Sequence, residues 1–239
     1  MIKYIDSKQN NKIKHAASLK ESKYRKEYQE FLAEGKKALD LALFSKHVKE
    51  IFTLKELPDV PKEITQYIVN KDVLEKISLS GSPEGIVLVS SIVNRNPKHA
   101  RKVVYLDHVS DPGNVGTIIR TALAFSFDAV VLSDGCCDPY NEKAVSASKG
   151  GIFLMPVIRG KLEDYSEGRQ VIVSALTDKA ISSDQLECKN PFVLVVGNEA
   201  AGVSSDIIQK ADIITKIPIE NIDSLNVAVA AGILMNKLR

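Results

Sequence analysis

The chain has 239 residues, of which 44% are hydrophobic and 26% charged, and its formal net charge is +2. This composition is enough to build a packed core, which excludes a disordered or fibrous protein, and no apolar run reaches the roughly 18–20 residues that span a bilayer. The start is polar and lysine-rich, and the three cysteines match neither a disulfide framework nor a zinc motif, so we expect a cytoplasmic protein with reduced thiols, no membrane span and no metal.

The first ninety or so residues predict a small α/β module. Residues 1–18 show no helical period, so we expect an extended or loop-like segment there. From Ser22 to Ala33 the apolar side chains recur at i, i+4, i+7 and i+8, which predicts one helix, and Gly35 ends it before a second at 36–43. The other elements expected in this module are two strands, at 51–54 and 86–92, and a short helix at 73–77.

Basic side chains are concentrated at the start of the chain. Residues 1–26 hold eight Lys or Arg and two acidic side chains, whereas residues 101–239 hold 14 basic and 17 acidic ones. Clustered positive charge suits a phosphate backbone. A solvated lysine-rich surface is the alternative, and charge alone does not separate the two interpretations.

A polar segment at 93–102 predicts a linker, after which apolar runs alternate regularly with helical segments. Continuous apolar strands alternating with helices predict a parallel sheet covered on both faces. The expected strands are 103–106, 129–132, 153–157, 171–175, 192–196 and 213–217, and the expected helices are 115–125, 142–148, 204–210 and 224–238.

Glycines and polar residues follow three of these strands. The segments read DPGNVGTIIRTA from Asp111, GNEAAGV from Gly197 and IPIENIDSLNVAVAAGI from Ile217. Ligands of open α/β sheets collect beyond the carboxyl ends of the strands, so three such loops predict one composite site. The chain has neither a dinucleotide fingerprint nor a phosphate-binding GK[ST] loop. Its four histidines have no acidic or cysteine partner at motif spacing, which argues against a catalytic triad.

Two charged side chains stand out in these loops. The Arg120 guanidinium suits a planar clamp on phosphate or carboxylate. Glu199 would be costly to bury alone, and we expect Arg120 to be its cationic partner. Ser224 is positioned to cap the last helix. Taken singly, Arg120 pairing with a surface carboxylate and Ser224 acting only as a cap are the alternatives.

Together the three segments resemble the SpoU (TrmH-type) RNA 2′-O-ribose methyltransferases. That family shares the patterns N-x-G-x-x-x-R, G-N-E-G-x-G and I-P-M…S-L-N-V-S-x-A, and the resemblance extends over 103–239. The matching residues are Asn114, Gly116 and Arg120, then Gly197, Asn198, Glu199 and Gly202, and finally Ile217, Pro218, Ser224, Leu225, Asn226, Val227 and Ala230. The N-terminal part resembles the family's accessory RNA-binding module, which is similar to small ribosomal proteins, through Ser7, Asn10, Ile13, Lys14, Lys23, Arg25 and the FLAEG segment at 31–35.

The resemblance implies a fold and a reaction. The implied fold is α/β, with a small RNA-binding substrate domain at 1–95, a linker at 96–102 and a parallel-sheet domain with a deep trefoil knot at 103–239. The implied reaction transfers a methyl group from S-adenosylmethionine to a ribose 2′-hydroxyl in RNA, with 23S-type ribosomal RNA favoured by the accessory module. Family members are homodimers with the active site near the subunit interface.

Carried over by position, the resemblance also implies roles for individual residues. Arg120 is the central catalytic residue, surrounded by Asn114, Glu199, Ser224 and Asn226. The expected cofactor pocket is lined by Gly197, Ile217, Leu225, Ala175, Leu176, Ile219 and Gly202, largely through backbone groups. The expected RNA-binding side chains are Asn10, Lys14, Lys20, Lys23 and Arg25. Arg120 acts either as a base or as an electrostatic clamp, and since a guanidinium keeps its proton at neutral pH and is a poor base there, the clamp is favoured.

Several positions depart from the family pattern. Ala200 replaces a glycine, which would add strain if its φ is positive, Val203 replaces a leucine, and Ile219 replaces a methionine. Ser146 replaces an arginine, a change that weakens a substrate contact unless Lys143 or Lys149 replaces it. Arg120, Glu199 and Asn226 are retained, which predicts an active enzyme.

Three other functions compete with this interpretation. A transfer RNA 2′-O-methyltransferase is the alternative within the family. A non-catalytic RNA-binding or ribosome-assembly factor on the same fold is motivated by the changes at Ala200 and Ser146. A nucleotide-binding oxidoreductase is disfavoured by the missing dinucleotide fingerprint.

Overall fold

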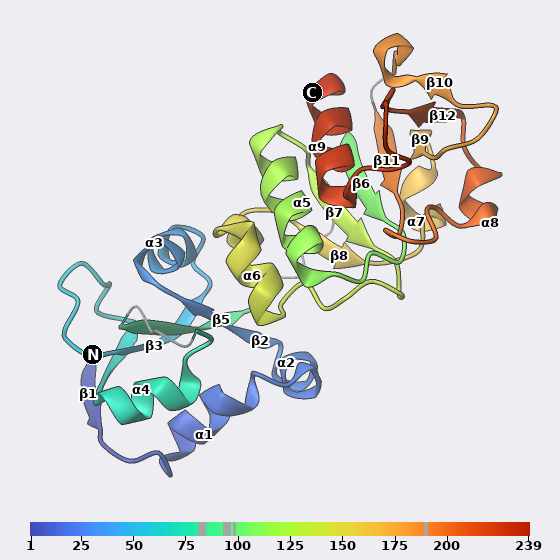
Figure 1. The fold of residues 1–239 in the computed structure, drawn as a ribbon. Helices are drawn as coiled ribbons and strands as arrows, with labels where there is room; N and C mark the ends of the chain where they lie inside the picture. Colours follow the sequence, from blue (N-terminus) through green and yellow to red (C-terminus); the bar gives the residue numbers. More distant parts are fainter. Residues whose placement is uncertain (81–84, 93–96, 98, 189–190) are drawn as a thin grey trace. The chain divides into compact units, whose positions relative to one another are not determined.

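The structure, a computed structural model, describes residues 1–80, 85–92, 97, 99–188 and 191–239. It divides into two compact units, one of Met1–Val93 with Tyr140–Leu154 and one of Asn94–Pro139 with Met155–Arg239 (Figure 1). Positions 96 and 98 of the predicted linker lie outside the described residues. Among the helices that are described, none is long and apolar enough to cross a membrane.

The first unit is built on a mixed sheet of strand order β1-β4-β3-β5-β2. β4 is parallel to β1 and β3, whereas β5 is antiparallel to β2 and β3. Helices α1 and α4 contact each other and share a core with the sheet in which Ile13, Leu74, Phe52 and Val87 are buried. The strands are β1 (Ile2–Ile5), β2 (Glu30–Glu34), β3 (Val48–Thr53), β4 (Thr65–Val69) and β5 (Ile86–Ser91), and the helices are α1 (Asn11–Ser18), α2 (Ser22–Tyr28), α3 (Lys36–Phe44), α4 (Lys71–Ile77) and α6 (Glu142–Ser148).

Residues 140–154 pack within this first unit although they follow β7 (Ala129–Leu132) in the sequence. The Phe31 ring lies 4.9 Å from that of Tyr140 and 5.5 Å from that of Phe153. Phe153 ends a 3₁₀ turn at Gly151–Phe153. The strand expected at 153–157 therefore begins later than predicted, and the observed strand β8 is Val157–Arg159.

Two expectations for the N-terminal module are also wrong. Residues 2–5 are extended as expected and form β1, but residues 11–18 form α1. The Asn10 side chain caps this helix by accepting a hydrogen bond from the Lys12 backbone N–H at 2.9 Å. The helix expected to run from Ser22 to Ala33 ends at Tyr28. Gln29 adopts a left-handed conformation with φ 53°, after which the chain enters β2.

Glu30, at the start of β2, is a buried carboxylate held by Lys49 and His15. It accepts a hydrogen bond from Lys49 Nζ at 2.5 Å and contacts His15 Nε2 at 2.6 Å. Burial alone raises the pKa of the Glu30 carboxyl, but the hydrogen bonds from Lys49 and His15 outweigh it and leave that pKa below its ordinary value.

Glu30→Gln is therefore expected to flatten the pH dependence of stability on the acid side. A carboxyl whose pKa is lower in the folded than in the unfolded state stabilises the fold above the unfolded value of about 4.3, and this contribution is lost as the pH falls through the folded value. Urea unfolding between about pH 5 and pH 3 measures the slope, with the exposed Glu27→Gln as control. An unchanged slope in Glu30→Gln would exclude Glu30 as the group that titrates.

The second unit is built on a parallel sheet of strand order β10-β12-β9-β11-β6-β7-β8, which confirms the predicted α/β class. Its central strands β9, β11, β6 and β7 are valine-rich and mostly buried, as a sheet covered on both faces requires. Helices α5 and α9 pack against each other beside the sheet (Figure 1). The strands are β6 (Lys102–Leu106), β7 (Ala129–Leu132), β8, β9 (Gln170–Ser174), β10 (Ile181–Ser182), β11 (Phe192–Val196) and β12 (Ile213–Lys216), and the helices are α5 (Pro112–Ala124), α7 (Glu163–Ser166), α8 (Ser205–Ile208) and α9 (Val227–Lys237).

Candidate functional site

A cavity of about 400 Å³ lies in the second unit, beyond the carboxyl ends of β9, β11 and β12. Its walls are formed by the loops that follow these three strands, which meet at one edge because the strands are parallel. All seven residues expected to bind the cofactor line it: Gly197, Ile217, Leu225, Ala175, Leu176, Ile219 and Gly202. Thr177 also lines the cavity, and its Oγ1 is buried without a hydrogen bond to the described part of the chain.

The loop after β11 folds back on itself tightly. Asn198 and Gly202 exchange two backbone hydrogen bonds of 2.9 Å each. A Cβ on Gly197 would lie 2.3 Å from both the Gly202 carbonyl carbon and the Val203 nitrogen, so only glycine fits there. Ala200 is not among the residues with positive φ, so its replacement of the family's glycine adds no left-handed strain.

Three polar side chains from distant segments meet beside this loop. Asn114 Nδ2 on α5 donates to Glu199 Oε1 at 2.7 Å, and Asn226 Nδ2 donates to Asn114 Oδ1 at 2.9 Å. Asn226 also caps α9, because its Oδ1 accepts from the backbone N–H groups of Ala228 and Val229. Three of the five expected catalytic residues therefore form one hydrogen-bonded chain.

The other two expected catalytic residues stand apart from this chain. Glu199 accepts from Asn114, so its expected pairing with Arg120 is wrong. Asn114 and Arg120 are six positions apart on α5, which turns their side chains to different faces. Arg120 is exposed and forms no hydrogen bond or ion pair with any residue that the structure describes. Ser224 lines the cavity but does not cap the last helix, since Asn226 does.

Two substitutions at Asn226 separate its capping role from its contact with Asn114. Serine is also a good N-cap, whereas alanine is not, so Asn226→Ala is expected to lower the free energy of unfolding by about 1 kcal/mol and Asn226→Ser by much less. Both remove the amide donor to Asn114, so both are expected to lower the activity expected of this site. Urea unfolding and initial rates measured side by side check this, and full activity in Asn226→Ser would contradict a role for the amide.

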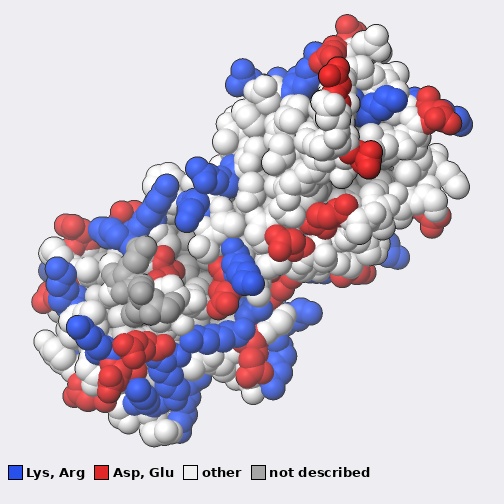
Figure 2. All heavy atoms as spheres, in the orientation of Figure 1, with Lys and Arg blue, Asp and Glu red and all other residues white. Residues whose placement is uncertain are grey.

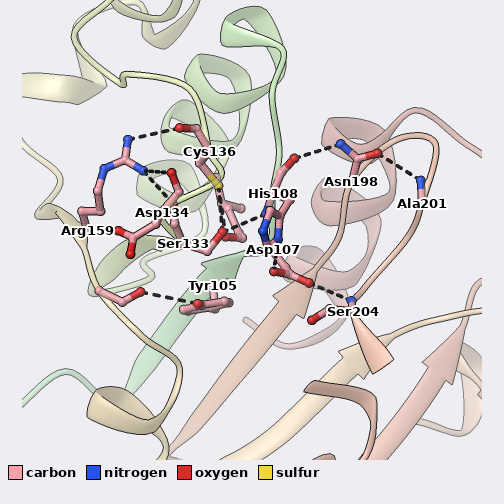
Figure 3. A network of polar contacts seen from close by, with 12 residues as sticks. Tyr105, Asp107, His108, Ser133, Asp134, Cys136, Arg159, Asn198, Ala201 and Ser204 are labelled. Atoms are coloured by element: carbon pink, nitrogen blue, oxygen red, sulfur yellow. Dashed lines mark hydrogen bonds and ion pairs between the residues drawn. The ribbon is translucent and has the colours of Figure 1, made fainter. Parts of the chain in front are cut away.

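A second polar network, which the sequence did not predict, holds the loops after β6, β7 and β11 together (Figure 3). Asp107 is 2% exposed, and its carboxylate accepts from Ser204 N at 2.8 Å and contacts His108 Nδ1 at 2.7 Å. Asn198 Nδ2 donates to the His108 carbonyl at 2.9 Å. Arg159 donates to four backbone carbonyls, those of Ser133, Asp134, Cys136 and Cys137.

The histidines are less isolated than their spacing indicated. His108 contacts Asp107, its neighbour in the sequence, and His15 contacts Glu30. The Ser133 hydroxyl accepts from the His108 backbone N–H and does not donate to the His108 ring, so this cluster does not have the geometry of a nucleophile and base. The sequence does contain a signal that could have pointed to Asp107, because this acidic residue directly follows a predicted buried strand.

The structure also places the expected RNA-binding residues of the first unit. Lys14, Lys20 and Lys23 are exposed, and Asn10 caps α1. Arg25 is 5% exposed and donates from Nη1 to the Leu19 and Lys20 carbonyls at 2.8 Å each. Its guanidinium holds the connection between α1 and α2, and its contact with RNA stays a prediction.

The cysteines are free thiols in protein contacts. Cys136 is buried, and its Sγ lies 3.1 Å from the Leu106 carbonyl oxygen. Burial raises the pKa of the Cys136 thiol, and it raises the pKa of the Cys137 thiol to about 12. Among the described residues no group of three or more His, Cys, Asp or Glu side chains is placed to hold a metal ion.

Two family profiles match the chain. The profile of the SpoU rRNA Methylase family matches residues 101–236. The profile of the MRM3-like substrate binding domain matches residues 10–88. These two segments cover most of both structural units.

Individual proteins match over the whole length. A 23S rRNA (guanosine(2553)-2′-O)-methyltransferase from Bacillus subtilis, RlmP, is 35% identical over 248 aligned residues that cover 100% of each chain. A crystal structure of an AdoMet-bound rRNA methyltransferase from Sinorhizobium meliloti matches with a TM-score of 0.88, 28% identity and coverage of 99% of this chain and 97% of that one. The structure of a TrmH-family protein from Porphyromonas gingivalis matches with a TM-score of 0.86, 28% identity and coverage of 97% of this chain and 98% of that one.

Proposed function

Since the chain belongs to the SpoU rRNA Methylase family and is an RNA methyltransferase that uses S-adenosylmethionine, we propose that it methylates a ribose 2′-hydroxyl in 23S ribosomal RNA. The observation that carries the proposal is the match to the Bacillus subtilis 23S rRNA methyltransferase, which extends over the full length of both chains. The MRM3-like substrate binding domain supports an RNA substrate in the same way. We propose residues 1–95 as the substrate domain and 103–239 as the knotted catalytic domain of a cytoplasmic homodimer.

The cavity residues fit S-adenosylmethionine. Gly197 lets the loop after β11 close on itself and form one wall of the cavity, Ile217 and Leu225 offer apolar walls, and Thr177 Oγ1 has a hydrogen-bonding capacity that no described residue satisfies. Buried polar groups are costly when unpaired, so a polar ligand in this cavity would satisfy the threonine. When bound, S-adenosylmethionine supplies an electrophilic methyl group on a sulfonium centre.

The side chains beside the cavity fit the binding of the RNA and the stabilisation of charge on the ribose oxygen. Asn114, Glu199 and Asn226 form a fixed chain of hydrogen bonds that holds α5, the loop after β11 and the start of α9 in register. Arg120 has an exposed guanidinium with no protein partner among the described residues, which leaves it available to an RNA phosphate and to the negative charge that develops on the ribose oxygen. A guanidinium keeps its proton at neutral pH, so we propose electrostatic stabilisation rather than proton abstraction as its role.

Ribose-methylation mapping tests the proposal directly. The purified protein is incubated with labelled S-adenosylmethionine and, separately, with 23S rRNA, 16S rRNA and transfer RNA transcribed without modifications. We expect label in 23S rRNA at one ribose. Label confined to transfer RNA would support the alternative substrate within the family, and cofactor binding with no transfer to any RNA would support a non-catalytic RNA-binding factor.

A further inference from the structure

Three aromatic rings form a continuous surface cluster on helices α1 and α2 of the first unit. The rings of Tyr24 and Tyr28 are nearly parallel, with centroids 6.0 Å apart and an interplanar angle of 7°. The His15 ring packs against Tyr28 with a centroid distance of 4.7 Å. Tyr28 is 40% exposed, whereas the stacked pair of Phe52 and Tyr67 in the same unit is buried. The cluster is therefore not needed to fill the core.

A buried carboxylate holds the cluster in place, and lysine side chains surround it. His15 is fixed by its contact with the buried Glu30, which Lys49 also binds. The Lys23 ammonium lies 4.5 Å from the Tyr24 ring centroid. Lys14, Lys20 and Lys26 are exposed on the same two helices or the turn between them, and Figure 2 shows basic side chains gathered over this part of the unit, next to some acidic ones.

We propose that His15, Tyr24 and Tyr28 form a stacking platform that binds an unpaired base of the RNA substrate. Aromatic faces stack on bases of any sequence, and cations next to them bind the phosphates on either side. Bases of an A-form duplex are already stacked on one another and their faces are closed to side chains, so the platform selects single-stranded nucleotides. The inference rests on the proposed function in taking RNA as the substrate, and it adds which RNA structure the first unit recognises.

Binding measurements on the full-length protein test the platform separately from methyl transfer. The probe is a fluorescently labelled 12-nucleotide RNA of mixed sequence, as a single strand and as a duplex with its complement, followed by anisotropy at one salt concentration. Tyr28→Leu is expected to weaken single-strand binding about tenfold and to change duplex binding less than twofold. Tyr28→Phe keeps the ring and is expected to bind within about twofold of the parent. Tyr4→Leu is the matched control, because Tyr4 is a 77% exposed tyrosine on β1 of the same unit.

Intrinsic fluorescence gives a readout that needs no variant. The chain has seven tyrosines and no tryptophan, so base stacking on the platform is expected to quench tyrosine emission when the single strand is added. The platform is contradicted if the parent protein shows no quenching, or if Tyr28→Leu binds the single strand as tightly as Tyr4→Leu. The platform would also be contradicted if Tyr28→Leu lost the same fraction of its affinity for the single strand as for the duplex. Stacking without any methyl transfer would instead contradict the proposed function and leave the platform standing.

Discussion

Arg120→Ala is expected to lower the rate of methyl transfer about 10³-fold while S-adenosylmethionine affinity stays within about tenfold, or ~1.4 kcal/mol. The two effects separate because Arg120 is exposed on α5 and does not line the cavity that we propose for the cofactor. Removing the guanidinium therefore removes stabilisation of developing charge and leaves the cofactor's walls intact. Single-turnover rates at saturating cofactor measure the first effect, and calorimetry measures the second.

Two further variants sharpen this test. Arg120→Lys keeps the positive charge but loses the planar fork that binds phosphate through two hydrogen bonds, so an intermediate rate is expected. Arg239→Ala is the matched control, because Arg239 is an exposed arginine of the same unit that packs over the Phe125 ring. An Arg120→Ala enzyme that turns over like Arg239→Ala would exclude the assigned role. Loss of cofactor binding in Arg120→Ala would show that the side chain acts on the pocket instead.

The parallel sheet was predictable because its strands are short, continuous apolar runs. The residues Ala129–Leu132 and Phe192–Val196 form strands with the expected bounds, and Glu142–Ser148 forms the expected helix. The rule that ligand loops gather beyond the carboxyl ends of parallel strands then predicted that the three distant segments meet. The cavity and the contacts among Asn114, Glu199 and Asn226 follow that prediction.

Partners of individual side chains were not predictable by the same reasoning. Glu199 binds Asn114 rather than Arg120 because the phase of α5, and not the distance along the sequence, decides which side chain faces the loop. The Asp107–Ser204 contact joins residues 97 positions apart, and no local pattern encodes it. Periodicity failed near Tyr28 because Phe31 and Leu32 are buried in a strand as they would be in a helix, so the apolar spacing fits both.

The largest loss of cofactor binding is expected from Gly197→Ala. The added Cβ would lie 2.3 Å from backbone atoms of Gly202 and Val203, and backbone cannot move aside as the end of a flexible side chain can. The loop after β11 must therefore open, which breaks the two hydrogen bonds between Asn198 and Gly202 and reshapes one wall of the cavity. We expect S-adenosylmethionine affinity to fall about 100-fold, or ~2.8 kcal/mol.

Gly168→Ala is the control that separates a steric clash of the added Cβ from strain at a positive φ. Gly168 lies in the same unit with φ +69° and nothing within 4 Å of an added Cβ, so alanine there costs about 1–2 kcal/mol of stability through left-handed strain and leaves the cavity unchanged. Calorimetric titration of both variants with S-adenosylmethionine, alongside their thermal unfolding, compares the two effects. Because Gly197 does not have a positive φ, its requirement for glycine comes from the closeness of the chain alone. If Gly197→Ala bound the cofactor as tightly as Gly168→Ala, the ligand would not depend on the closed form of this loop, and the cavity would lose its assignment.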